Sequence, residues 1–243
     1  LIVLGGRPAM GKTSLSLNMA LNVSKKQNLP VCLFHLEISQ EQISNRFLSM
    51  ELGIESGRLR TGRLQLDEWS LLSEGIDSLS KLPLHITDQP ISSIQEMQSI
   101  CQKIKEESEK KSLGLVILDY VQLLDYLPIS DVSNREEYLL KLAKSLKRMA
   151  EELNVPVIVI SQLSKDVEKR RNKRPMLSDI RDFEPLEVYS DIITMIYRDE
   201  YYNPDTEDRG ITEIITCKHR NGPVGTVKLL FEPQFTRYRN LAA

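Results

Sequence analysis

Short apolar runs alternate with longer, more polar segments along the first part of the chain. The runs are typical of buried strands, and we expect them at Leu1–Gly5, Val31–Leu36, Leu84–Thr87, Leu113–Leu118 and Val155–Ser161. The fourth run is almost continuous in Leu, Val and Ile, as in a parallel strand that is covered on both faces. The pattern therefore predicts a parallel sheet.

The segments between these runs repeat apolar residues every three or four positions, which indicates amphipathic helices. We expect helices at about Lys12–Lys25, Gln40–Leu52, Asp67–Leu82, Ser93–Lys110 and Glu136–Leu153. Strands that alternate with helices in this order predict an α/β fold of three layers.

The last part of the chain follows a different pattern. The stretch from Gln162 to about Pro185 is polar and has almost no periodicity, so we expect a long functional loop. Strand-like runs follow at Ile192–Tyr197, Ile211–Cys217, Thr226–Phe231 and Phe235–Tyr238, with turn residues between them. The sheet should thus be mainly parallel, with antiparallel strands at its C-terminal edge.

Composition sets limits on the class of protein. The chain has 243 residues, of which 41% are hydrophobic and 27% charged, enough for one sizeable core and one expected domain. Lys and Arg number 32 and Asp and Glu 34, so the net charge is −2. This excludes a polycation that coats nucleic acid by bulk attraction, and any nucleic-acid site must be local.

Other sequence signals argue against membrane, secreted and metal-cluster proteins. No apolar run approaches the roughly 20 residues of a membrane-spanning helix, and no secretory signal is recognisable, so we expect no membrane partner. The chain begins inside the predicted strand Leu1–Gly5, which indicates a fragment of a longer protein. Cys32, Cys101 and Cys217 are far apart and lack His at ligand spacing, which argues against disulfides and zinc.

The sharpest chemical signal is Gly6–Thr13, which matches GxxxxGK[ST] between a predicted strand and a predicted helix. Glycines let the backbone N–H groups face phosphates, and the helix adds its positive N-terminal end. Lys12 can reach the β- and γ-phosphates, and the Thr13 hydroxyl can ligate Mg²⁺. We expect the nucleotide to be held by Gly6, Arg7, Pro8, Ala9, Met10, Gly11, Lys12, Thr13 and Ser14.

Three polar residues close predicted strands and should meet this loop. Asp119 follows a buried strand and is the candidate for the second metal-holding acid. Glu37 and Gln162 close two other strands in the same way. Ligands of open α/β sheets collect at the carboxyl ends of the strands, so we expect Glu37, Asp119 and Gln162 to form one constellation around the phosphates.

Further short segments follow the phosphate loop in a fixed order; together they are GRPAMGKTS, LE at Leu36-Glu37, LDYVQL, LNVP, SQL, NKRP, YRDE and KHRNGP. With these segments the chain resembles the RecA-like C-terminal motor domain of DnaB-type replicative DNA helicases. The resemblance runs nearly end to end, so the whole chain, residues 1–243, would be one RecA-like P-loop NTPase domain without the family's N-terminal domain and linker helix.

The resemblance implies a ring hexamer that encircles single-stranded DNA and moves 5′ to 3′ by hydrolysing ATP with Mg²⁺. Each nucleotide would lie between neighbouring subunits. Primase and a helicase loader are the implied protein partners. The implied compartment is a bacterial cytoplasm or a plastid stroma.

The resemblance also implies roles for single residues. Lys12 and Thr13 would hold phosphate and Mg²⁺, Asp119 would hold Mg²⁺, Glu37 would activate the attacking water, and Gln162 would sense the γ-phosphate. Lys218 and Arg220 match the family's basic pair, which reaches the neighbouring subunit's nucleotide. Arg220 can offer a planar fork to the transferring phosphoryl group. His219 should point to the opposite face of an extended segment.

The candidate DNA contacts lie in the polar stretch. Leu163–Pro175 holds six basic and two acidic residues, and six minus two leaves +4. Such a segment can hold phosphates without reading sequence, and its lack of aromatic residues argues against base stacking. The predicted DNA-binding residues of this segment are Lys165, Arg170, Arg171, Lys173 and Arg174, and the resemblance adds Arg181 and Asp182.

The chain departs from the family's pattern just after this segment. Glu184 stands where the family has a glycine whose backbone approaches DNA, so either the loop is remodelled or its grip on DNA is weaker. Two alternatives to a helicase motor stay open: a RecA-like switch ATPase, and a DNA-binding or scaffold paralogue without motor activity. ATP turnover stimulated by single-stranded DNA would separate the three.

Overall fold

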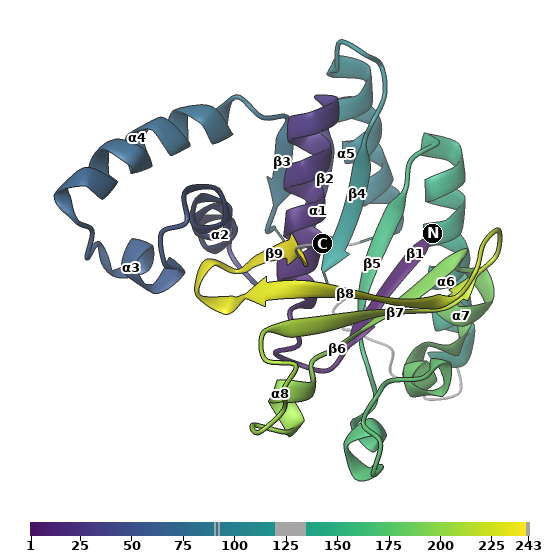
Figure 1. Ribbon diagram of the computed structural model, residues 1–243. Helices are drawn as coiled ribbons and strands as arrows, with labels where there is room; N and C mark the ends of the chain where they lie inside the picture. The colour runs from purple at the N-terminus through teal and green to yellow at the C-terminus, as the bar shows by residue number, and fades with distance from the viewer. Residues whose placement is uncertain (90, 92, 120–134, 242–243) are drawn as a thin grey trace.

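A computed structural model describes residues 1–89, 91, 93–119 and 135–241 of the chain. Its central feature is a sheet of order β3-β2-β4-β5-β1-β6-β7-β8-β9 (Figure 1). The strands are β1 Ile2–Gly6, β2 Val31–His35, β3 Leu84–Thr87, β4 Leu115–Asp119, β5 Val157–Gln162, β6 Ile192–Tyr197, β7 Ile211–His219, β8 Gly225–Glu232 and β9 Arg237–Asn240.

The predicted sheet type is confirmed. Strands β1 to β6 pair in parallel, whereas β6, β7, β8 and β9 pair in antiparallel fashion. Strand ends lie within a few residues of the sequence-based bounds. One strand is displaced: the predicted Phe235–Tyr238 begins as the 3₁₀ helix η5 (Pro233–Phe235), because Thr236 adopts a left-handed turn before β9.

Helices cover the two faces of the sheet and make the predicted three layers. The helices are α1 Lys12–Gln27, α2 Gln40–Leu52, α3 Ser56–Thr61, α4 Leu66–Ser80, α5 Ile94–Glu107, α6 Arg135–Leu153, α7 Glu184–Tyr189 and α8 Asp199–Tyr202. On one face α5, α6 and α7 pack against Phe34 and Leu118. On the other, α1 and α2 pack against Leu33 and Ile117. Neighbouring strand residues thus enter different cores, which explains the continuous apolar runs.

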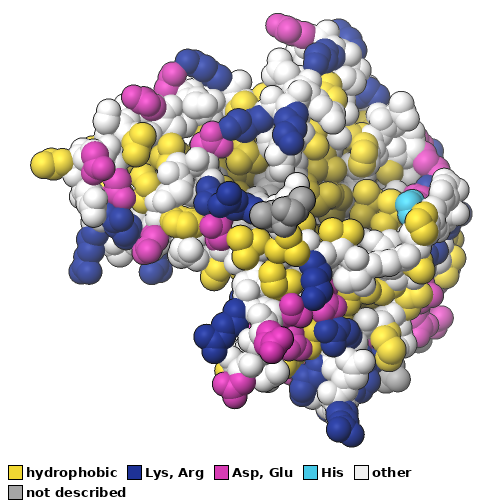
Figure 2. Space-filling model, viewed as in Figure 1, with side chains coloured by type: hydrophobic (Ala, Val, Ile, Leu, Met, Phe, Trp, Pro, Cys, Tyr) yellow, Lys and Arg dark blue, Asp and Glu magenta, His cyan; other side chains and the backbone are white. Residues whose placement is uncertain are grey.

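Helices α3 and α4 project from the body beside α2 (Figure 1), and the space-filling view shows the same projecting lobe (Figure 2). The sequence missed α3 because six residues are too few to show a period. Gln65 and Glu68 form a capping box at the start of α4, and an ion pair from Arg58 to Glu68 ties α3 to it.

The stretch from Gln162 to Pro185 is not an irregular loop, and that prediction is wrong. It contains the 3₁₀ helices η3 (Lys165–Lys169) and η4 (Leu177–Phe183), and it leads into α7. Ser164 caps η3 through its side chain, and Asp179 accepts the backbone N–H of Met176 at 2.7 Å. Such short turns are fixed by local side-chain hydrogen bonds and leave no hydrophobic period.

The described residues also bear on the expectations for membrane-spanning helices, cysteines and metal clusters. No helix among the described residues is long and apolar enough to cross a membrane. Cys32, Cys101 and Cys217 are free thiols. The residues that the structure describes include no cluster of His, Cys, Asp and Glu suited to a metal ion.

Candidate functional site

The loop Gly6–Thr13 joins β1 to α1 and turns sharply at two positions. Ala9 and Gly11 both have positive φ, 61° and 96°. At Gly11 a Cβ atom would also collide with the hydroxyl of Tyr238, so β9 and the left-handed backbone both require glycine there. Helix α1 begins at Lys12 with no side-chain cap, which leaves its first N–H groups for a ligand.

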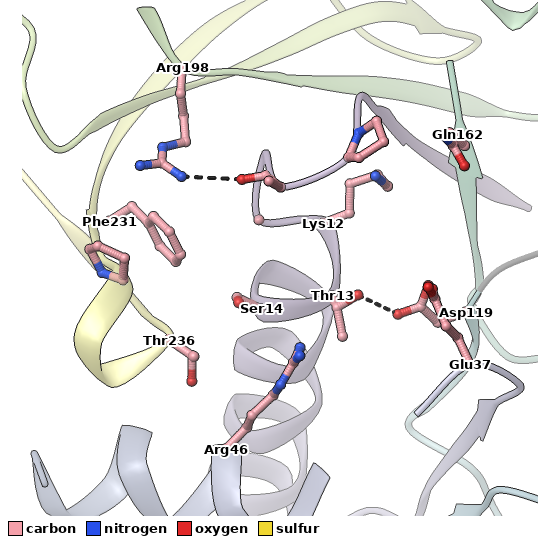
Figure 3. Close-up of a pocket in the computed structure, with 14 residues that line it drawn as sticks. Lys12, Thr13, Ser14, Glu37, Arg46, Asp119, Gln162, Arg198, Phe231 and Thr236 are labelled. Carbon is pink, nitrogen blue, oxygen red and sulfur yellow. Dashed lines mark hydrogen bonds between the residues drawn. The ribbon is translucent and has the colours of Figure 1, made fainter. Parts of the chain in front are cut away.

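A cavity of about 450 Å³ opens over this loop (Figure 3). Its size lies in the range of small-molecule sites. Residues from both ends of the chain surround it: Pro8, Ala9, Gly11, Lys12, Thr13, Ser14, Glu37, Arg46, Asp119, Gln162, Arg198, Phe231, Pro233 and Thr236.

Glu37, Asp119 and Gln162 all line the cavity, as the sequence predicts. They follow or end β2, β4 and β5, which are neighbours in the sheet and lie next to β1. The carboxyl ends of these parallel strands therefore bring together residues that are far apart in the sequence. Gln162 pairs in register with Gly6, where the phosphate loop starts.

The Thr13 hydroxyl donates a hydrogen bond of 2.6 Å to Oδ2 of Asp119. Nδ1 of the buried His35 lies 3.4 Å from the same oxygen, because His35 and Asp119 are partners in the β2–β4 ladder. A hydroxyl and a carboxylate side by side are hard oxygen ligands of the kind that Mg²⁺ takes beside phosphates. The donor set therefore fits this cation.

Lys12 is held inside the loop, where its Nζ donates to the carbonyl oxygen of Arg7 at 3.0 Å. Burial lowers the pKa of Lys12 to about 8, and the nearby charge of Asp119 opposes this shift. A phosphate ligand would supply the missing negative charge and favour the ammonium form.

Arg46 reaches the cavity from α2 (Figure 3) and was not among the residues predicted from the sequence. Burial lowers the pKa of its guanidinium, and the carboxylates Asp119 and Glu37 oppose that shift. One signal was available. Arg46 lies three residues after Ile43 and four before Met50, both buried, so a charge stands on the core-facing side of the helix.

The wall opposite the acids was also missed. Arg198 follows β6; its guanidinium lies 4.8 Å from the centre of the Phe231 ring, and it donates to the carbonyl of Ala9 at 3.3 Å. Pro233 and Thr236 complete this side. Phe231 and Pro233 carry no motif, so only the return of β8 and β9 to the phosphate loop reveals them.

Three residues of the predicted cradle do not line the cavity. Gly6 lies in β1, and Met10 is buried in the core beneath the loop. The Arg7 side chain donates to Oε1 of Glu168 and to the carbonyl of Leu163, both at 2.8 Å. It therefore turns toward Leu163–Pro175, which we call the basic segment.

Lys218 and Arg220 lie far from this cavity. The end of β7 pairs with Ile192 at the start of β6, whereas the phosphate loop follows the end of β1, which runs parallel to β6. The two cations therefore lie at the opposite ends of the strands from the phosphate loop. There Lys218 donates to the carbonyl of Glu187, and Arg220 to that of Val188 at 2.7 Å. His219 lies instead against the turn, 3.4 Å from the carbonyl of Pro223.

Several cations of the predicted DNA segment are bound within the molecule. Arg170 makes two hydrogen bonds to Asp179, Arg174 makes two to Glu213, and Lys173 donates to the backbone of Glu168. Within the described residues, Lys165 and Arg171 are exposed and make no such bond.

The remaining DNA-site predictions concern the segment just beyond. The side chains of Arg181 and Asp182 lie outside the described ones, so those predictions stay open. Glu184 begins α7 with ordinary helical angles, φ −46° and ψ −38°, which need no glycine. A carboxylate is also favourable in the first turn of a helix.

Comparisons with known proteins point to one family. The model of the family described as DnaB-like helicase C terminal domain matches residues 1–240. The replicative DNA helicase DnaB of Geobacillus stearothermophilus is 43% identical over 241 residues, which are 99% of this chain and 52% of that protein. A probable replicative DNA helicase of Trieres chinensis is 45% identical, over 98% of this chain and 52% of that protein.

Among solved structures, a DnaB-like replicative helicase, described with its interactions with primase, superposes with a TM-score of 0.93 at 35% identity. The match covers all of this chain and 57% of that one. The chain thus spans about half the length of the curated relatives that it matches.

Proposed function

The chain belongs to the family of DnaB-like helicase C-terminal domains, and from this premise we propose that it is an ATP-driven motor that moves 5′ to 3′ on single-stranded DNA. The observation that carries the proposal is the cavity over Gly6–Thr13. It combines a phosphate loop, an amine, two carboxylates and a carboxamide at the carboxyl edge of one sheet.

In the proposed bound state the N–H groups of the loop and the start of α1 hold the phosphates of ATP, and Lys12 turns from the carbonyl of Arg7 to the β- and γ-phosphates. Arg198, Phe231 and Pro233 lie across the loop from the acids, which leaves this wall for the ribose and base. Arg46 adds a positive charge beside Glu37 and Asp119.

Hydrolysis needs a nucleophile in line with the γ-phosphoryl group. Glu37 orients and deprotonates the attacking water, and Gln162 contacts the γ-phosphate. Thr13 and Asp119 would hold Mg²⁺, which neutralises charge on the phosphate oxygens. Loss of the γ-phosphate would remove this contact of Gln162, which ends β5 just before the basic segment.

The opposite position of Lys218 and Arg220 supports action on a neighbouring copy. Neither side chain lines its own chain's cavity. In a ring, the edge that carries β7 would face the next subunit's phosphate loop and complete its site. We propose a ring assembly on this basis, and six subunits per ring on the family resemblance.

The remaining partners follow from the family. Single-stranded DNA would contact the segment that contains Lys165 and Arg171, in the centre of the ring. The relative described with its interactions with primase supports primase as a partner, and a helicase loader is proposed with it. We propose a bacterial cytoplasm or a plastid stroma as the compartment.

The test is phosphate release from ATP with and without oligo-dT, together with unwinding of forked duplexes that carry a 5′ or a 3′ tail. The proposal expects DNA-stimulated turnover and unwinding that needs the 5′ tail. Nucleotide-dependent assembly without strand separation would indicate the switch ATPase. DNA binding without turnover would indicate the non-motor paralogue.

A further inference from the structure

The phosphate loop and the basic segment are joined by a side chain that neither ATP chemistry nor DNA contact requires. Arg7 is the second residue of the loop, yet its guanidinium points away from the cavity. Nε donates to Oε1 of Glu168 and Nη1 to the carbonyl of Leu163, both at 2.8 Å. The Arg7 side chain is 9% exposed and that of Glu168 39%.

Both contacts fall in the segment that follows β5. Leu163 also donates its N–H to the carbonyl of Gly6 at 3.4 Å, so backbone and side chain together attach the start of the segment to the loop. Glu168 belongs to η3, and its own carbonyl accepts a hydrogen bond from Lys173 at 2.8 Å. A movement of Glu168 therefore carries η3 and the turn after it.

The cations available to a ligand lie on this same piece of chain. Lys165 begins η3, and Arg171 follows it by two residues. Arg170 and Arg174 are instead fixed to Asp179 and Glu213. Displacing η3 thus changes the presentation of Lys165 and Arg171 while the rest of the segment stays anchored.

The carbonyl of Arg7 connects this residue to the nucleotide site. It accepts the hydrogen bond of the Lys12 ammonium at 3.0 Å. Phosphate competes for the same ammonium, because a charge-assisted bond to phosphate is stronger than a bond to a neutral carbonyl. Nucleotide binding therefore removes one of the two hydrogen bonds at the Arg7 carbonyl and leaves the longer one, 3.4 Å from the backbone N–H of Met10. The peptide that carries the Arg7 side chain can then shift.

We propose that Arg7 is a positioning residue that couples the occupancy of the phosphate loop to the placement of η3 through Glu168. Its backbone responds to the nucleotide through Lys12, and its side chain passes the response to the basic segment. The inference rests on the proposed function, which supplies the ATP and the DNA that the two ends would bind.

The first test is hydrogen–deuterium exchange of residues 163–173 with and without Mg²⁺ and a non-hydrolysable ATP analogue. It needs no DNA. In the wild-type protein the analogue should change exchange in this segment. In Glu168→Gln, which keeps the size of the side chain but weakens the bond to Arg7, most of that change should disappear while exchange in Gly6–Ser14 still responds.

The matched control is Asp166→Asn. Asp166 lies in the same 3₁₀ helix, pairs with Lys169 at 2.7 Å, and loses the same charge on substitution. The control should keep the wild-type response. An unchanged response in Glu168→Gln, equal losses in Glu168→Gln and Asp166→Asn, or no response in the wild-type protein would overturn the proposal.

A double-mutant cycle measures the coupling itself. Oligo-dT affinity is measured with and without the analogue in Arg7→Lys, Glu168→Gln and the double variant. Allosteric couplings commonly correspond to factors of about 5 or more. Each single variant should lower the nucleotide effect on DNA affinity by about fivefold, and the double variant no further. Additive losses would contradict a shared link.

Affinity for a fluorescent nucleotide serves as the second readout. It should stay within about twofold of wild type, because the Arg7 side chain does not line the cavity. A loss of nucleotide binding in Arg7→Lys equal to that in Lys12→Ala would place Arg7 in the binding site and overturn the coupling role. If exchange responds as expected but DNA changes neither turnover nor affinity, the proposed motor function fails and the Arg7–Glu168 link stands.

Discussion

The cavity and the basic segment both gather positive charge, but they use it differently. In the cavity, Lys12 and Arg46 face carboxylates without a direct ion pair among the described residues, and burial lowers the pKa of both. In the segment, Arg170 and Arg174 are fixed to carboxylates by paired hydrogen bonds. A local charge of +4 therefore overstates what DNA can contact, whereas Lys12 and Arg46 keep their charge for a ligand. The third cation of the cavity, Arg198, already pairs with Glu200.

The basic pair Lys218 and Arg220 is a third group of cations, and the largest expected effect on ATP turnover comes from Arg220. Arg220→Ala should lower ATP turnover by about 10³-fold or more, because a guanidinium donated across an interface stabilises the transferring phosphoryl group. Fluorescent-nucleotide affinity of single subunits should stay near wild type. Phosphate release and equilibrium titration measure the two quantities.

The control for that variant is Arg239→Ala, an exposed cation of β9 that pairs with Glu232 at 3.7 Å. It should hydrolyse ATP as the wild type does. Normal turnover in Arg220→Ala would remove β7 from the catalytic site.

The second effect separates binding from chemistry inside the cavity. Glu37→Gln should bind ATP normally and lose about 10²–10⁴-fold in turnover, as expected for a general base. Lys12→Ala should lose nucleotide binding, because the ammonium contacts the phosphates in the ground state. Equal losses of binding in both variants would reject the role given to Glu37.

A smaller effect, on nucleotide affinity, is expected from Arg46. Arg46→Ala should weaken nucleotide binding by about tenfold, the scale of one charged hydrogen bond. Arg46→Lys should restore part of it, since the charge returns without the fork. Calorimetric titration with a non-hydrolysable ATP analogue measures this, and wild-type affinity in Arg46→Ala would show that the side chain only packs.

The smallest effects test the basic segment. Replacing Lys165 and Arg171 by Ala should make the log–log salt dependence of oligo-dT binding shallower by about 0.7 for each lost phosphate contact. Arg174→Ala should leave that slope nearly unchanged but lower the free energy of unfolding by about 1–2 kcal/mol, because Glu213 loses its partner. Titrations over a salt series and urea denaturation measure the two. The reverse outcome would make the Arg174–Glu213 pair dispensable and Arg174 a DNA contact.

Much of this site could be predicted because its signals are local. A buried run ends at a defined residue, so Glu37, Asp119 and Gln162 could be placed at one edge of the sheet before their neighbours were known. The sheet order itself needed the structure, since strand pairing depends on contacts far apart in the sequence.

The rest could not be predicted because it depends on pairing across the fold. Phe231 reaches the cavity only because β8 returns over the phosphate loop. The bonds from Arg174 to Glu213 and from Arg7 to Glu168 join residues far apart in the chain. Charge counting treats such cations as free, and only the folded chain shows which of them are already bound.

We propose that one copy's cavity is completed by the next copy's Arg220. The direct measurement mixes Lys12→Ala subunits with Arg220→Ala subunits, each inactive alone, and follows ATP turnover with oligo-dT while affinity-tag capture confirms mixed assemblies. We expect partial recovery of ATP turnover, because some interfaces then pair an intact phosphate loop with an intact Arg220. No recovery in assemblies shown to be mixed would contradict it.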